Sequence, residues 1–344
     1  MSEVKVNKLS PRSGTTVTIG DSGDTINIVG TLQNNGSVIP GDISSVVAGT
    51  GLSGGGTSGD VTLNVEAAQS GVTSLGTLTG LTVNGNVSVD GGTIKLDGNY
   101  PTGTDNVALG NTALDSVEAG ATDNIAIGSN AGTAITTGDQ NIAIGSDALC
   151  KTTTGDPNVA IGYASMVCNV TGQYNTAVGY LTLNKNTADC NTAIGMNTMK
   201  SNTTGACNVA IGRNTLDANT TADSNTAVGT EALSANTTGA HNTAVGKNAL
   251  LANTTGCNNS AVGSGSLDAN TTGECNVAFG KAALTVNTTG DSNTAIGSCA
   301  LVHNETADNN TAVGFESLKA NTTGTANTAI GKIALCANTT GSCN

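Results

Sequence analysis

The sequence predicts an all-β protein whose C-terminal two thirds is a stacked parallel β-roll, a form of β-solenoid. Two observations carry this prediction: a repeat of 17 residues that begins at Asn106, and a shortage of large side chains. Glycine supplies 47 of the 344 residues, aromatic residues make up 2% of the chain, and tryptophan is absent. An ordinary compact core uses large side chains, so this chain must bury small ones along an extended axis.

Charge and hydropathy exclude several classes of protein. Only 11% of the residues are charged and Val, Ile and Leu recur regularly, which is not typical of disordered segments. The net charge is −13 with no basic run, which disfavours nucleic acid as a partner because phosphate contacts need clustered Lys and Arg. No signal-peptide core and no run of about 18 apolar residues is visible. We therefore expect synthesis in a cytoplasm and no membrane insertion.

The repeat has the consensus N-[T/V/I/S]-A-[V/I/L/F]-G-x-x-A-L-x-x-N-T-T-G-x-x, and each copy is called a rung here. Fourteen rungs start between Asn106 and Asn327, spaced by 17 residues except for an 18 at the first step and a 16 between Asn175 and Asn191. Position three is alanine and position five is glycine in every rung. We single out these structural repeat positions in the middle of the array: Ala177, Gly179, Ala193, Gly195, Ala210, Gly212, Ala227, Gly229, Ala244, Gly246, Ala261 and Gly263.

Each rung is expected to hold two short strands joined by two turns, because a 17-residue period is too short for a helical hairpin. The segment N-T-A-V-G favours a strand, and N-T-T-G supplies a turn that tolerates left-handed backbone angles. Alternation sends positions two and four to one face and the fixed alanine to the other. We expect position four and the later leucine to form two apolar columns inside the coil, represented by Val178, Ile194, Ile211, Val228, Leu216, Leu233 and Leu250.

One rung buries too little apolar surface to order itself, so stacking must supply the remaining stability. A continuous backbone ladder and columns of asparagine side chains paired from rung to rung are expected to do so. The thin core, and an outward alanine column that lets another backbone approach closely, predict association of several chains. Fourteen rungs at ~4.8 Å give a rod of roughly 65 to 70 Å.

Three segments divide the chain. We assign 1–40 as an N-terminal attachment segment, 41–104 as a Gly-rich linker and β shaft, and 105–344 as the β-roll. The runs TTVTIGDSGDTINIVGTL and LTVNGNVSVDGGTIKL alternate as strands do and are broken by Gly-Asp and Asn-Gly turns. The glycines between them are followed by no Gly-Lys-Ser/Thr and no helix, so they do not predict a phosphate-binding loop.

These segments resemble known fibres. SVVAGTGLSGGGTSGDVTLNV and GTLTGLTVNGNVSVDGGTIKLDG resemble shaft and linker segments of phage tail fibres, especially those of marine phages. The opening VNKLSPRSGTTVTIGDSGDTI is similar to the N-terminal portion of such fibres, which attaches to the virion. The repeat NTAVGxxALxxNTTG resembles tail-fibre repeats and the head repeats of trimeric autotransporter adhesins, which are trimeric left-handed parallel β-rolls. The resemblance therefore implies a homotrimer.

The sequence predicts no catalytic, cofactor-binding or metal-binding residue. His241 and His303 fall in different columns, and the rungs lack the regular Asp of calcium-binding β-rolls. The nine cysteines show no zinc spacing and are expected to be reduced. Cys190 and Cys207 share a position one rung apart, within reach of a disulfide if their side chains point together. The carboxylates vary from rung to rung as solvated positions do; they include Asp217, Glu231, Asp268 and Glu316.

The expected function is that of a non-enzymatic, homotrimeric phage tail fibre that resides in the virion. Its N-terminal segment is expected to join a virion tail or baseplate protein, and the fibre to contact a host cell-surface glycan or protein receptor through many weak contacts. The alternatives are a bacterial surface adhesin or extracellular filament subunit, a polysaccharide depolymerase with paired carboxylates in a trimer groove, and an ice-binding solenoid built on its threonine columns.

Overall fold

A computed structural model describes residues 33–34, 37–38, 46–47, 52–56, 63–65 and 103–344. The chain divides into two units, Met1–Gly91 and Gly92–Asn344. The described residues form strands, turns and bends and contain no helix. The strands predicted over 15–32 and 81–96, and most of the attachment segment 1–40, lie outside the described residues.

In the first unit, the described residues form short antiparallel strands. β1 (Gln33–Asn34) pairs with β2 (Ser37–Val38). β4 (Leu52–Gly56) lies between β3 (Val46–Val47) and β5 (Leu63–Val65) in a three-stranded sheet. Part of the Gly-rich stretch is therefore a β-strand.

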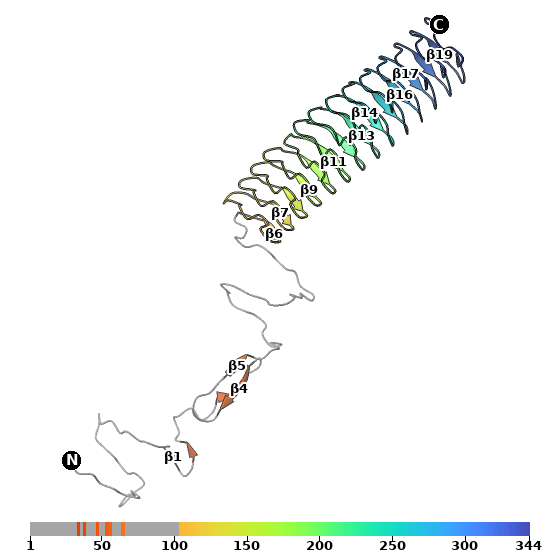
Figure 1. Cartoon of the computed structure of the whole chain (residues 1–344). Coiled ribbons are helices and arrows are strands. Elements are labelled where there is room, and N and C mark those ends of the chain that lie inside the picture. Colours follow the sequence, from red (N-terminus) through yellow and green to blue (C-terminus); the bar gives the residue numbers. More distant parts are fainter. Residues whose placement is uncertain (1–32, 35–36, 39–45, 48–51, 57–62, 66–102) are drawn as a thin grey trace, which may run out of the picture. The chain divides into compact units, whose positions relative to one another are not determined.

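The second unit is a β-solenoid, as the 17-residue period predicts. Fourteen strands of three residues form one parallel sheet in which each strand pairs in register with the strand of the next rung, and they follow one another along the coil in chain order (Figure 1). One strand per rung is found where we expected two, so that expectation was wrong, and turns make up the rest of each rung. The strands are β6 (Val107–Leu109), β7 (Ile125–Ile127), β8 (Ile142–Ile144), β9 (Val159–Ile161), β10 (Thr176–Val178), β11 (Thr192–Ile194), β12 (Val209–Ile211), β13 (Thr226–Val228), β14 (Thr243–Val245), β15 (Ser260–Val262), β16 (Val277–Phe279), β17 (Thr294–Ile296), β18 (Thr311–Val313) and β19 (Thr328–Ile330).

In-register pairing places each residue against the residue at the same position of the neighbouring rung. In the strands, Thr226 N–H donates to the carbonyl oxygen of Asn242 at 2.8 Å, and Gly229 N–H donates to that of Ile211 at 2.8 Å. Equivalent bonds recur along the coil, so every rung is joined to its neighbours by the same backbone contacts. A rung thus takes much of its stability from the two rungs that flank it.

Two columns of buried asparagine side chains run along the interior. At position one, the backbone N–H of Asn242 donates to Oδ1 of Asn225 at 2.9 Å, and Nδ2 of Asn242 donates to the Gly256 carbonyl at 2.8 Å. At position twelve, Nδ2 of Asn253 donates to Oδ1 of Asn236 at 2.8 Å. The predicted asparagine ladders are confirmed. Hydrogen bonding to neighbouring rungs lets these amides be buried without a large desolvation cost.

The two faces of the strand are the reverse of what we expected. The alanine of position three, not the residue of position four, points into the coil: Ala177 is fully buried, whereas Ile194 is 39% exposed and Ile211 38% exposed. The interior is narrow, because two asparagine columns and the leucine column already occupy it, and a methyl group fills the space that remains. The predicted leucine column, Leu216, Leu233 and Leu250, is confirmed as fully buried.

The turns bring the leucine into the core through an uncommon backbone conformation. Leu216, Leu233 and Leu250 have φ of 54°, 55° and 53°, in the left-handed region that large residues rarely adopt. Gly229 has φ of 137°, and a Cβ there would lie 2.5 Å from the carbonyl oxygen of Gly246 in the next rung. Close stacking of the turns therefore explains why position five is always glycine.

The rung that starts at Asn124 shows how tightly the interior is filled. Gly132 stands where most rungs have Leu or Met, and Ile135 stands where later rungs have Asn. Ile135 is fully buried, and a Cβ on Gly132 would lie 3.0 Å from its Cδ1 atom. The isoleucine fills the space left by the missing leucine, so two changes compensate each other within one rung.

Enlarging the inner alanine should destabilise the coil. In Ala244→Leu, the larger side chain has no space between rungs, and we expect unfolding free energy to fall by about 1 to 3 kcal/mol, measured by urea denaturation. Lys247→Leu, at an exposed position of the same rung, is the matched control and should change it by less than about 0.5 kcal/mol. Equal losses in both variants would contradict the inward placement of Ala244.

Candidate self-association surface

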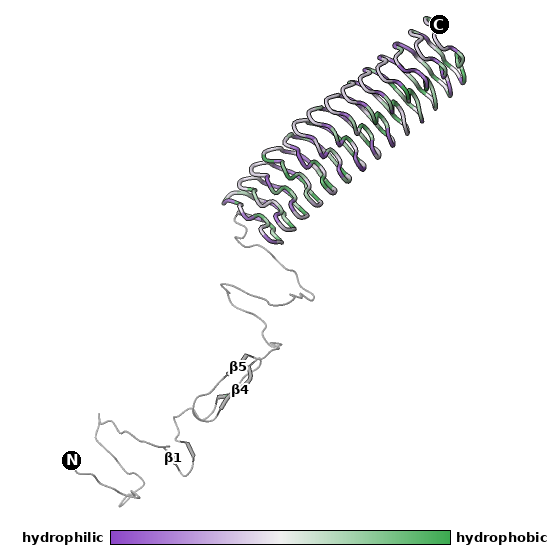
Figure 2. The backbone as a smooth tube through the Cα atoms, in the orientation of Figure 1, coloured by the Kyte–Doolittle hydropathy of each residue, from purple (hydrophilic) through white to green (hydrophobic). Residues whose placement is uncertain are grey.

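The outward side chains of β6–β19 make one continuous surface, which we call the outer strand face. It consists of positions two and four of every rung. Position four is apolar in all fourteen rungs, and Figure 2 shows hydrophobic residues recurring in each rung along the coil. These residues are Leu109, Ile127, Ile144, Ile161, Val178, Ile194, Ile211, Val228, Val245, Val262, Phe279, Ile296, Val313 and Ile330.

This column is exposed and uncharged. None of the residues at positions two to four carries a charge, although the chain has a net charge of −13. Phe279 is 52% exposed, and the other position-four residues range from partly to mostly exposed. Position two is Val or Ile in the first four rungs and mostly Thr afterwards. Monomeric proteins rarely expose a contiguous apolar patch larger than several hundred Å², so this face has the character of an interaction surface.

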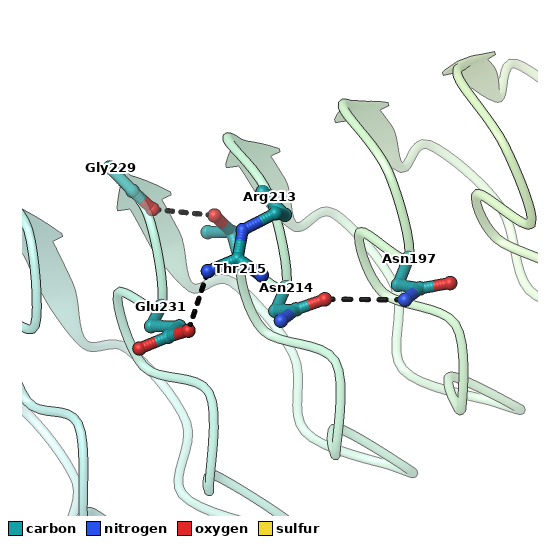
Figure 3. Close-up of polar contacts among 6 residues, drawn as sticks. All are labelled: Asn197, Arg213, Asn214, Thr215, Gly229 and Glu231. Atoms are coloured by element: carbon teal, nitrogen blue, oxygen red, sulfur yellow. Dashed lines mark hydrogen bonds and ion pairs between the residues drawn. The ribbon is translucent and has the colours of Figure 1, made fainter.

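Polar contacts between rungs lie beside the outer strand face. Nη2 of Arg213 and Oε1 of Glu231 form an ion pair at 3.0 Å, and Nδ2 of Asn197 donates to Oδ1 of Asn214 at 3.3 Å. Thr215 Oγ1 donates to the Gly229 carbonyl at 2.6 Å (Figure 3). The ion pair is solvent-exposed and so contributes at most about 1 kcal/mol. In the part of the chain that the structure describes, these groups contact one another from rung to rung, beside an apolar column that stays exposed to solvent.

An exposed aromatic pair lies one turn beyond the strands. Tyr163 and Tyr180 occupy position six of adjacent rungs, and their rings stack with centroids 5.4 Å apart and an interplanar angle of 16°. Both are about half exposed, and Tyr174 is also exposed. Three of the four tyrosines of the chain therefore gather in two consecutive rungs.

The carboxylates singled out in the sequence are held in different ways. Asp217 and Asp268 share a column three rungs apart, a separation of roughly 14 Å. Burial raises the pKa of the Asp217 carboxyl, and the nearby Glu231 raises it further. Glu231 is paired with Arg213, and Glu316 accepts a hydrogen bond from Lys319 Nζ at 2.8 Å.

The histidines and other possible ligands do not converge. His241 and His303 are both exposed and lie in different columns. The described part of the chain holds no group of three or more His, Cys, Asp or Glu side chains placed to bind a metal ion. Within those same residues there is no helix long and apolar enough to cross a membrane.

Comparison with known protein families and with curated protein sequences finds no match to this chain.

The sequence analysis did not identify the outer strand face, although the sequence carries a signal for it. Position four accepts Val, Ile, Leu and Phe, whereas position three accepts only Ala. A narrow interior demands one size, so the column that varies in size is the outer one.

Asp217 makes stability depend on pH. The pKa of the Asp217 carboxyl is higher in the folded chain than in the unfolded chain, so protonation of this group favours folding. This stabilisation is fully present below the unfolded pKa and is lost as pH rises through the folded pKa. Asp217→Asn should therefore raise the urea midpoint at pH 7 and leave it unchanged near pH 3. Glu274→Gln, at an exposed position, serves as the control and should change neither midpoint. An unchanged midpoint at pH 7 in Asp217→Asn would contradict the effect of burial.

Proposed function

We propose that this chain is a structural and adhesive fibre protein that assembles as a homotrimeric rod. The outer strand face carries this proposal: fourteen apolar side chains stand in one uncharged, exposed column along the whole coil. Burying such a column is favourable because each apolar side chain leaves water. The alanine column gives no support here, since it lies inside the coil.

The partner best matched to this column is a second copy of the same chain. A partner must repeat its contacts at the rung spacing of ~4.8 Å over fourteen rungs, and an identical parallel coil does so without adjustment. A contact made at one rung is then made at every rung. Closed cyclic symmetry is the usual outcome of such association. A column one residue wide is better shielded when it meets two neighbouring columns at a threefold axis than when it meets one, which favours three copies.

The resemblance to phage tail fibres gives the rod its proposed setting in the virion. In this proposal the N-terminal segment joins a virion tail or baseplate protein, and the rod projects toward the host. Three linked copies multiply weak contacts with a host cell-surface glycan or protein receptor. The exposed tyrosine pair, Tyr163 and Tyr180, adds aromatic surface, and tyrosine is enriched at contact surfaces.

The assembly state is tested by light scattering with negative-stain imaging. We expect three times the chain mass of 33.5 kDa, and rods whose β-roll portion is about 65 Å long. The double variant Ile194→Lys with Ile211→Lys places charges in the column that the trimer would bury, and it should weaken association by roughly 100-fold or more.

The matched control places the same two charges on another side of the same rungs. Thr204→Lys with Thr221→Lys changes exposed turn positions and should leave the mass unchanged. A monomeric mass for the wild type, or equal dissociation of the two double variants, would contradict the proposed interface.

The proposed location in the phage tail is tested separately with an antibody raised against residues 103–344. Gold-labelled antibody should decorate the tails of phage particles that carry this chain. Decoration of a bacterial envelope, with unlabelled particles, would overturn the tail-fibre assignment in favour of a surface adhesin.

A further inference from the structure

The rung that starts at Asn175 interrupts the pattern of the coil. It has 16 residues and lacks one residue of the N-T-T-G turn, which here reads N-T-A-D-C. In later rungs each position-twelve Oδ1 accepts a hydrogen bond from the next asparagine, as Asn236 does from Asn253 at 2.8 Å. Asn169 Oδ1 is buried and has no hydrogen-bond partner, and Nδ2 of Asn186 donates to the Ala188 carbonyl within its own rung at 2.8 Å. The position-twelve asparagine ladder is therefore broken between Asn169 and Asn186, whereas the position-one ladder continues through this rung.

Two cysteines lie just after this point in the chain. Cys190 ends the shortened rung and Cys207 ends the next one, each directly before the asparagine that starts a new rung. Their φ angles are 60° and 58°, and both are exposed. Two residues further on, Thr192 pairs in register with Val209. The two side chains thus leave neighbouring rungs from the same position in the same backbone conformation.

The spacing of the two cysteines suits a disulfide. Cys207 N–H donates to the carbonyl of Asp189, which precedes Cys190, at 3.3 Å, so the two turns are in direct contact. Neighbouring rungs are separated by ~4.8 Å, within the Cα–Cα range of about 4.4 to 6.8 Å that disulfides span.

The other cysteines provide internal controls. Cys275 occupies the same position as Cys190 and Cys207 and is exposed, but its column neighbours are Asn258 and Ser292. Cys257 lies one rung before Cys275 but one position earlier, and its Sγ accepts a hydrogen bond from Ala240 N–H at 3.4 Å, in the preceding rung. Cys190 and Cys207 are thus the two cysteines of the coil that share a column in adjacent rungs.

We propose that Cys190 and Cys207 are a redox modification site whose disulfide staples the shortened rung to the rung that follows it. The oxidant class is a low-molecular-weight disulfide. One protein thiolate attacks a sulfur of that disulfide and releases one small thiol, and the second thiolate attacks the resulting mixed disulfide and releases the other. Two protein thiols lose two protons and two electrons, and the small disulfide gains them. The inference rests on rung geometry and is independent of the trimer.

Staple formation should accelerate as pH rises. Desolvation raises the pKa of the Cys190 thiol, and the adjacent Cys207 and Asp189 raise it further; Tyr174 holds the same position in the preceding rung. Thiolate, the attacking species, is therefore scarce near neutral pH. Reduced thiols persist in a cytoplasm, and an oxidising medium outside the cell favours the bond.

The test treats the full chain with oxidised glutathione at pH 8.5 and then blocks remaining thiols with a maleimide. Cleavage at Lys185, Lys200 and Arg213 places Cys190 in peptide 186–200 and Cys207 in peptide 201–213. We expect these peptides as one cross-linked species from within a single chain, while Cys275 stays unlinked to any other protein cysteine. The urea midpoint should rise on oxidation in the wild type and in Cys275→Ser, and stay unchanged in Cys190→Ser and Cys207→Ser.

Two results would overturn the proposal. One is that Cys190 and Cys207 both end as free thiols or glutathione adducts, as an unpaired exposed thiol such as Cys275 does. The other is that the cross-link joins two chains, seen as a reducible band of twice the chain mass on a denaturing gel.

Discussion

Like-on-like stacking governs this protein. Parallel pairing in register places every residue on its own equivalent in the next rung, so each position must tolerate a copy of itself at ~4.8 Å. Asparagine satisfies this condition because its amide both donates and accepts hydrogen bonds, as the column through Asn236 and Asn253 shows. A buried column of aspartates would repel itself along its length. The low share of charged residues and the abundance of Asn, Thr and Gly follow from this single condition.

The same condition moves the larger aliphatic side chains to the surface. Two polar ladders and one leucine column fill the interior, so alanine faces inward and Val, Ile, Leu or Phe faces outward from the same strand. The coil therefore buries its smallest apolar side chains and exposes many of its larger ones. A single coil therefore exposes an apolar surface that grows in proportion to its length. In the proposed trimer, a partner of the same period would remove that surface from water at every rung.

Periodicity in the sequence was sufficient to predict the solenoid, the rung boundaries, the asparagine ladders and the leucine column. It did not predict which face of the strand lies inside, because alternation shows only that positions two and four share a side. That choice depends on the width of the interior, which the turns determine. The turns rely on leucines such as Leu216 in the left-handed region, and leucine gives no sequence signal for that conformation. The second strand that we expected in each rung was a wrong prediction for the same reason, because the sequence does not reveal the conformation of these turns.

Departures from the repeat differ in whether a second change in the same rung compensates for the first. In one rung, the larger Ile135 fills the space that is left where Gly132 replaces the usual leucine, and the interior stays filled. At Asn169 the lost hydrogen bond is not replaced, so the interface with the shortened rung carries a buried, unsatisfied oxygen. Stability in a solenoid is close to a sum over neighbouring rungs, so its weakest interface determines where the coil opens. The proposed disulfide between Cys190 and Cys207 lies one interface further along and would limit how far such an opening spreads.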